Sequence, residues 1–143
     1  MSIWQKNFDL ALLNKTRENT LIRHLDIEFI KFGDDFLCAT MPVDERTHQP
    51  MGLLHGGASV VLAETLGSSA GTLACPQGFA CVGLEINANH MRAVTSGLIT
   101  GITKPLHIGR TTQIWEIKMY DEQQRMNCIS RLTLSVIKHK PAP

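Results

Sequence analysis

The sequence predicts an α+β fold in which an antiparallel sheet curls around one long helix. The segment 57–75, GASVVLAETLGSSAGTLAC, is as long as a good helix and carries a single charge, Glu64. Its apolar residues occur all round the helical wheel, which is typical of a helix enclosed by other structure. Alternating apolar patterns, typical of strands, lie on both sides of it. An enclosed helix needs a sheet curled about it, so these three observations together define the fold class.

The residues before this helix predict two short helical pieces and a hairpin. Positions 8–17 form an amphipathic pattern that Asp9 can cap, and 21–25 suggest another turn or two of helix. The pattern then alternates over 27–32 and again over 36–43, with Gly33-Asp34-Asp35 as the turn between the two strands. Residues 44–50 are polar and end in proline, so we expect a loop leading to the helix.

The residues after the helix predict an antiparallel meander. Pro76-Gln77-Gly78 breaks the chain, and strands are expected over 80–91, 98–108, 111–120 and 129–137. Each strand has one apolar face. The residues expected to share one face are Val82, Leu84, Ile86, Ala88 and His90 in the first strand, and Gln113, Trp115, Ile117 and Met119 in the third. In the last strand we expect Leu132, Leu134 and Val136 to point inward.

Composition predicts one cytoplasmic domain spanning 1–143. The length suits a single core, and 43% hydrophobic with 19% charged residues is ordinary for a globular protein. A net charge of +1 gives no electrostatic reason to expect nucleic acid or a membrane surface as partner. The four cysteines lack zinc-site spacing and indicate a reduced compartment. We expect no signal peptide and, because Glu64 and Pro76 interrupt the apolar run, no membrane span.

The helix and the residues before it carry the chemistry. A carboxylate such as Glu64 in an enclosed helix is costly unless it is paired or functional. The first N–H groups of a helix have no internal partner, so Gly56 or Gly57 could hold a developing oxyanion. Ser68 follows Glu64 by one helical turn and shares its face. A clamp for an electrophile, a carboxylate and a hydroxyl together suit the transfer of an acyl group to water.

Three segments resemble a known family. MPVDERTHQPMGLLHGGASVVLAETLGS, VGLEINANHMR and KPLHIGR are similar to the hot-dog acyl-CoA thioesterases of the PaaI-like superfamily. The similarity is greatest to the bacterial group that contains the menaquinone-pathway 1,4-dihydroxy-2-naphthoyl-CoA thioesterase and the enterobactin proofreading thioesterase. The resemblance covers nearly the whole chain. It implies the hot-dog fold and hydrolysis of an acyl-CoA, aryl in this group, to a free acid and CoA.

The resemblance also implies roles for particular residues. Glu64 would be the nucleophile or the general base, Gly56 N–H would polarise the thioester carbonyl, and Gln49, His55 and Ser68 would orient the acyl group or the water. The positions that match the family's substrate-binding stretches are Gly83, His90, Met91, Arg92, Ala93, His107, Ile108, Gly109, Arg110, Thr111 and Thr112. Arg92 and Arg110 are the expected phosphate partners, because guanidinium forms charge-assisted bonds to phosphate. Met51 and Ala93 depart from the residues common in relatives.

Partners and cofactors follow from the same resemblance. The family's site lies between two protomers, which implies a homo-oligomer, a dimer at least and a homotetramer (a dimer of dimers) by analogy. The substrate would be a small-molecule acyl-CoA or a thioester on an acyl carrier protein. We expect no cofactor apart from the CoA of the substrate. We also expect no metal, because the histidines form no HxxxH pair.

Two other functions remain open at this point. A hot-dog hydratase or dehydratase shares the fold, although His55 leads into a double glycine and not into HFPG. A non-catalytic acyl-CoA-binding module would not need Glu64, whose carboxylate would then be a structural hydrogen-bond partner. Gly67 and Gly71 would most simply admit a neighbouring helix at a subunit interface.

Overall fold

The computed structural model describes residues 1–140, which form three helices and six strands. Their order follows the predicted order closely. The elements are α1 (Leu10–Lys15), α2 (Leu21–His24), β1 (Glu28–Phe32), β2 (Leu37–Pro42), α3 (Gly56–Leu73), β3 (Phe79–His90), β4 (Leu98–Ile108), β5 (Thr112–Tyr120) and β6 (Met126–Lys138). The expected cap of α1 is confirmed, since the Asp9 carboxylate accepts the Leu12 N–H at 2.7 Å.

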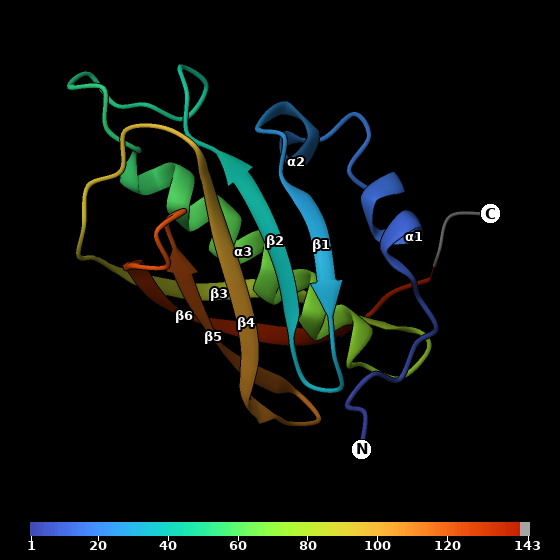
Figure 1. Cartoon of the computed structure of the whole chain (residues 1–143). Helices are drawn as coiled ribbons and strands as arrows, with labels where there is room; N and C mark the ends of the chain where they lie inside the picture. The colour runs from blue at the N-terminus through green and yellow to red at the C-terminus, as the bar shows by residue number, and fades with distance from the viewer. Residues whose placement is uncertain (141–143) are drawn as a thin grey trace.

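The six strands form one antiparallel sheet in the order β1-β2-β4-β5-β6-β3. Figure 1 shows this sheet curling round α3, with β1, β2 and β4 on one side of the helix and β3, β5 and β6 crossing behind it. The predicted α+β, hot-dog arrangement is therefore confirmed. The meander holds only for β4, β5 and β6, because β3 pairs with β6 and lies at the far edge of the sheet.

One side of α3 packs against the sheet, and its opposite side does not. Leu62, Ala63, Leu66 and Ala70 are fully buried, whereas Glu64 on the other side remains partly exposed. The prediction of a helix enclosed all round is wrong for a single protomer. The cause is that one curled sheet covers only about half of a helix that is apolar on every side.

Gly67 and Gly71 explain how closely α3 approaches the sheet. A β-carbon built on either glycine would lie 2.5 Å from a leucine methyl of β6, Leu132 at Gly67 and Leu134 at Gly71. The interpretation of these glycines as a gap for a neighbouring helix is therefore wrong, since both face the protein's own sheet. They are needed because no larger residue fits at this helix–sheet distance.

Strand β3 departs from its predicted alternation. The pairing with β6 shifts between Gly83 and Glu85, so Leu84 is left without a partner in a β-bulge. Val82 and Leu84 are 46% and 63% exposed, whereas Ile86 and Ala88 pack against the core, so the prediction that these residues share one face is wrong. A bulge reverses which face each following residue occupies, and this reversal leaves no clear signal in an alternating sequence.

The rest of the core agrees with the sequence patterns. The residues expected to share one face of β5 are all buried, and Trp115 stacks on Trp4 with ring centroids 6.4 Å apart. All four cysteines are buried and free. Strand β6 starts at Met126, three residues before its predicted start. Among the described residues, no helix is both long and apolar enough to cross a membrane.

Candidate active site

The N-terminal end of α3 leaves one backbone donor unused. His55 caps the helix, because its Nδ1 accepts the Gly57 N–H at 2.8 Å and its carbonyl accepts from Ala58 and Ser59. No described residue accepts the N–H of Gly56, the first residue of the helix. This N–H sits at the positive end of the helix dipole, where it can bind a negatively charged oxygen. Of the two candidate oxyanion donors, Gly56 and Gly57, only Gly56 therefore has a free N–H among the described residues.

Gln49 contributes a second donor from the loop before α3. Its side-chain Oε1 accepts the backbone N–H of Met51 at 2.5 Å and that of Leu53 at 3.4 Å. The loop also closes on itself through the bond from the Gln49 N–H to the Leu53 carbonyl, at 2.8 Å. With Oε1 held in this way, the amide nitrogen of Gln49 is the end available to a ligand.

His90 lies directly against Gly56. A β-carbon on Gly56 would be 3.1 Å from His90 Nε2, so a glycine at this position lets the imidazole approach the helix end. His90 is the last residue of β3, and the chain is fixed just beyond it, where the Met91 N–H donates to the Asn127 carbonyl at 2.8 Å. The end of β3 and the start of α3 thus meet at this point.

These groups line a cavity of about 420 Å³. Its walls come from the loop before α3, the first turn of the helix, the segment after β3 and the start of β6. The lining residues are Gln49, Leu53, Leu54, Gly56, Ser59, His90, Met91, Arg92, Ala93 and Asn127. The structure therefore brings together two of the predicted catalytic residues and four of the predicted substrate-binding ones. The volume suits a small organic ligand.

Glu64 lies outside this cavity. It is eight residues beyond Gly56, which corresponds to about 12 Å along a helix. Its carboxylate packs against Gly83 on the edge strand, where a β-carbon would be 3.4 Å from Oε1. Among residues 1–140 this carboxylate takes part in no ion pair. Glu64 is thus an unpaired charge facing the open edge of the sheet.

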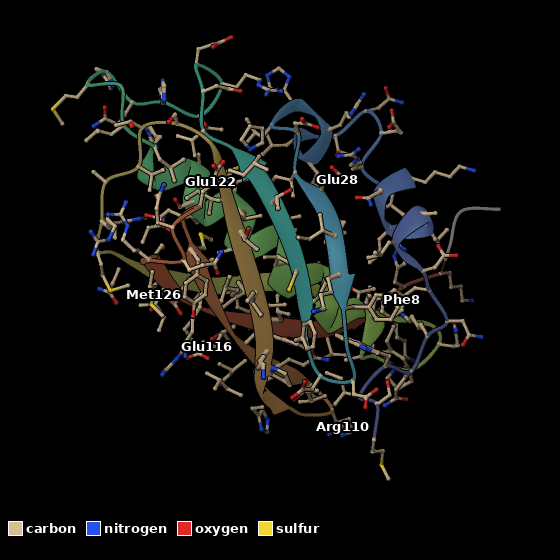
Figure 2. The ribbon with its side chains drawn as sticks, viewed as in Figure 1. Phe8, Glu28, Arg110, Glu116, Glu122 and Met126 are labelled. Atoms are coloured by element: carbon tan, nitrogen blue, oxygen red, sulfur yellow. The ribbon has the colours of Figure 1, made fainter. Side chains whose placement is uncertain are left out.

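The remaining predicted residues lie elsewhere in the protomer. Ser68 lines a separate, larger hollow between α3 and α1. Residues 107–112 form the end of β4 and the turn into β5, where Ile108, Gly109 and Arg110 border a cavity at the C-terminal end of α3. In Figure 2, Arg110 projects at the β4–β5 turn, far from Glu122, which borders a hollow together with Ala93, the neighbour of Arg92. Within one protomer, Arg92 and Arg110 therefore do not share a site.

The C-terminal end of α3 contains thiols that do not suit nucleophilic catalysis. Cys75 and Cys81 lie with their sulfur atoms 3.4 Å apart, and both are buried. Burial, strengthened by the neighbouring Cys75, raises the pKa of the Cys81 thiol to about 12. At neutral pH this thiol stays protonated, and only a thiolate is a good nucleophile. In the described part of the chain, no three side chains of His, Cys, Asp or Glu are grouped as metal ligands.

Four cavity residues were missed by the sequence interpretation, the apolar Leu53 and Leu54 and the polar Ser59 and Asn127. Ser59 and Asn127 are 2% and 3% exposed, and both line the cavity. Ser59 appeared as one of several small residues of the helix, and Asn127 fell before the predicted start of its strand. The available signal was the asparagine itself, because Asn is uncommon in strands and here stands between Met126 and Cys128.

The fold and this cavity together define a hot-dog protein with a cavity of small-molecule size at the start of its central helix. A model of the thioesterase superfamily matches residues 51–128. The proofreading thioesterase EntH of Cronobacter turicensis is 56% identical over 135 residues, covering 94% of this chain and 98% of that protein. The chain therefore belongs to the thioesterase superfamily.

Solved structures agree with this assignment. A thioesterase of Pseudomonas aeruginosa, solved as a glutamine-to-alanine mutant, superposes with a TM-score of 0.94 at 47% identity and covers 96% of this chain and 100% of its own. A thioesterase of Staphylococcus aureus, solved as glutamine-to-alanine and glutamate-to-alanine mutants, is 30% identical, with TM-scores of 0.79 and 0.80 over 83% of this chain and 98% and 99% of its own. The protein is a hydrolase of acyl thioesters.

Proposed function

We propose that this protein hydrolyses an aryl acyl thioester and that Glu64 provides the carboxylate for the reaction. The observation that carries the proposal is the state of Glu64. It is the only charge on α3, it has no ion pair among residues 1–140, and it lies against a glycine on an open sheet edge. An unpaired carboxylate in this setting is favoured only if it is kept for a purpose.

The carbonyl oxygen of the substrate would bind between the Gly56 N–H and the Gln49 amide. Both donors are free to bind it, as the geometry above describes. Donors aimed at the developing oxyanion stabilise the tetrahedral intermediate more than the ground state. His55 supports this arrangement by holding the Gly57 N–H, so that Gly56 remains the free donor.

The carboxylate would come from a second protomer. A general base must lie within hydrogen-bond reach of the proton it takes, and Glu64 of the same chain is about 12 Å along the helix from Gly56. Strand β3 is a twelve-residue edge with exposed Val82 and Leu84, so it can pair with the same strand of a second copy. Such pairing places Glu64, and Ser68 one turn beyond it, at a shared boundary. A dimer, and from it a dimer of dimers, is the proposed assembly.

The chemical step then runs as follows. Glu64 of the partner subunit removes a proton from a water molecule, and the water oxygen attacks the thioester carbonyl carbon. The carbon–sulfur bond breaks as the tetrahedral intermediate collapses, and the departing thiolate takes up a proton. The products are the free acid and CoA. In the alternative route, Glu64 itself attacks, expels the thiolate and forms a mixed anhydride that water then cleaves. Attack of labelled water on the Glu64 side of the anhydride would leave ¹⁸O in the Glu64 carboxylate after a single turnover, which the base route cannot do.

The spacing of two residues in a relative supports this assignment. The glutamine and the glutamate replaced in the Staphylococcus aureus thioesterase are 15 positions apart, as are Gln49 and Glu64 in this chain. The glutamine replaced in the Pseudomonas aeruginosa thioesterase carries the same position number as Gln49. Both residue types, at this separation, fit a carbonyl donor before the helix and a carboxylate within it.

The proposed substrate is an aromatic acyl group carried on CoA or on a carrier protein. The resemblance to aryl-CoA thioesterases favours an aromatic acyl group, with hydroxybenzoyl and the 1,4-dihydroxy-2-naphthoyl group of menaquinone biosynthesis as the candidates. The relationship to the proofreading thioesterase EntH supports thioester hydrolysis. Arg92, exposed at the cavity wall, would bind phosphate of the carrier. The reaction needs water and no further cofactor, and the proposed location is the cytoplasm.

Thiol release by wild type and by Glu64→Ala tests the proposal. The esters are hydroxybenzoyl-, naphthoyl-, phenylacetyl- and medium-chain acyl-CoA. We expect release from the aromatic esters and a loss of at least about 10³-fold in kcat for Glu64→Ala. Glu28→Ala, exposed on β1 at the opposite edge of the sheet, is the matched control and should stay active. Equal activity of wild type and Glu64→Ala would exclude the carboxylate, and binding without thiol release by either would favour a binding module.

A further inference from the structure

The cavity at the start of α3 contains a buried amide with nothing to bind. Asn127 is 3% exposed, and among residues 1–140 its Oδ1 has no hydrogen-bond partner. A buried amide left unpaired costs about as much free energy as a lost hydrogen bond, so native proteins keep few of them. The cavity needs Asn127 only for its backbone carbonyl, which accepts the Met91 N–H, and any residue could supply that carbonyl.

The Asn127 side chain does not stand alone. Ser59, on the first turns of α3 and 2% exposed, lines the same cavity and brings a hydroxyl to it. Leu53 and Leu54 add half-buried apolar surface, and Gln49, His90 and Arg92 add polar groups nearer the opening. A cavity in which apolar walls carry placed polar groups can orient a small molecule.

The direction of the substrate in the cavity determines what this polar pair can contact. If the thioester carbonyl binds at Gly56, the acyl group and the sulfur on its two sides point in different directions. The residues that can bind the phosphates of the carrier, Met91 to Ala93 with Arg92 among them, are exposed at the surface. The sulfur side therefore points outward, and the acyl group points toward the buried wall formed by Ser59 and Asn127.

We infer that Asn127 and Ser59 form a specificity subsite that binds a hydroxyl group on the acyl ring. This inference rests on the proposed function. A phenolic hydroxyl both donates and accepts, and an amide offers one acceptor and two donors, so the two groups pair well. The subsite would favour hydroxylated aryl thioesters and reject ring analogues without the hydroxyl, because the analogue leaves the buried amide unpaired.

The test compares matched esters that differ by one hydroxyl. The substrates are benzoyl-CoA and its 2-, 3- and 4-hydroxy derivatives, and the variants are Asn127→Leu and Ser59→Ala. We expect wild type to prefer at least one hydroxy isomer over benzoyl by about 10–100-fold in kcat/KM, the range that one buried hydrogen bond supports. Asn127→Leu should reduce that preference to within about threefold by lowering only the hydroxylated rate, and Ser59→Ala should reduce it partly.

A stability measurement separates this subsite from a structural role. Because the amide is unpaired in the free protein, replacing it with leucine should leave Tm unchanged or raise it. Gln123→Leu, which replaces an exposed amide in the turn after β5, is the control and should leave the preference intact. A fall in Tm for Asn127→Leu, or an equal loss on all four esters, would overturn the inference and assign Asn127 to the scaffold, to bound water or to the carrier's pantetheine arm.

The failure of this inference can be distinguished from failure of the proposed function. If Glu64→Ala retains full activity, the proposed function is wrong whatever Asn127 does. If Glu64→Ala is inactive and Asn127→Leu keeps the wild-type preference, only the subsite is wrong.

Discussion

Each end of α3 meets a buried side-chain amide of the sheet, and only one of the two amides has hydrogen-bond partners in the described part of the chain. At the C-terminal end, Gln113 is 1% exposed; its Nε2 donates to the Gly71 carbonyl at 3.3 Å, and its Oε1 accepts from Trp115 Nε1 at 2.8 Å. At the N-terminal end, the Asn127 amide and the Gly56 N–H have no partner among residues 1–140. Paired groups hold the fold together, whereas unpaired groups at equal burial are available to a ligand.

The largest expected effect tests whether a second protomer completes the active site at the N-terminal end of α3. Gln49→Ala should lower kcat by about 10²-fold, the usual cost of one oxyanion donor. When Gln49→Ala and Glu64→Ala protomers are unfolded together and refolded, about half of the dimers should be mixed and have one intact site, so activity should return to about a quarter of wild type. If one chain supplies the whole site, the mixture stays as inactive as its parents.

Replacing the amide at the C-terminal end of α3, that of Gln113, should lower stability and leave activity nearly unchanged. Gln113→Leu leaves Trp115 Nε1 without its acceptor in the core and should lower the free energy of unfolding by about 2–4 kcal/mol. Below the melting transition, kcat/KM should change little, because Gln113 lies at the other end of the helix. Urea denaturation followed by activity assays at low temperature would measure both effects, with Gln77→Leu, in the exposed turn, as control. A large loss of activity in the folded variant would contradict the distinction between a structural amide at the C-terminal end and a ligand-binding amide at the N-terminal end.

Gly56→Ala should have the smallest effect. The added β-carbon would lie 3.1 Å from His90 Nε2, so the imidazole must shift by a few tenths of an ångström while the backbone donor remains. We expect a loss of about tenfold in kcat/KM, because small displacements of positioned groups are costly. Adding His90→Ala to this variant should cost less than His90→Ala costs wild type, since the two changes act on one contact. Full additivity in kinetic measurements would show that the contact is unimportant.

Parts of this fold were predictable because a single local pattern determines them. Helix α3 follows from one long run with a single charge, and the buried side of β5 from strict alternation ending at Met119. Strand β3 failed because its neighbour is β6, and neither that crossover nor the bulge after Gly83 depends on nearby residues. The role of Gly67 could not be predicted either, because it depends on Leu132, 65 positions later in the chain.

The candidate site residues also divide into those that the sequence predicts and those that only the three-dimensional arrangement reveals. Gly56 and Glu64 were found because their chemistry is unusual within one helix, and the family resemblance added Gln49. Asn127 escaped notice because an asparagine among strand residues becomes informative only when its burial and its missing partner are known. Arg110 was grouped with Arg92 by type of charge, and only the three-dimensional arrangement separates them.

The position of β6 also determines when the protein can fold during its synthesis. This strand is the last of the described elements in chain order, yet it lies between β5 and β3 and supplies the leucines on which Gly67 and Gly71 rest. Until the ribosome has released Met126 to Lys138, α3 can pack on β2, β4 and β5 but lacks its β6 contacts, and β3 has no neighbour in the sheet. The nascent chain must therefore carry a partly covered apolar helix and an unpaired strand until β6 emerges, a period in which chaperones and premature self-association compete for it.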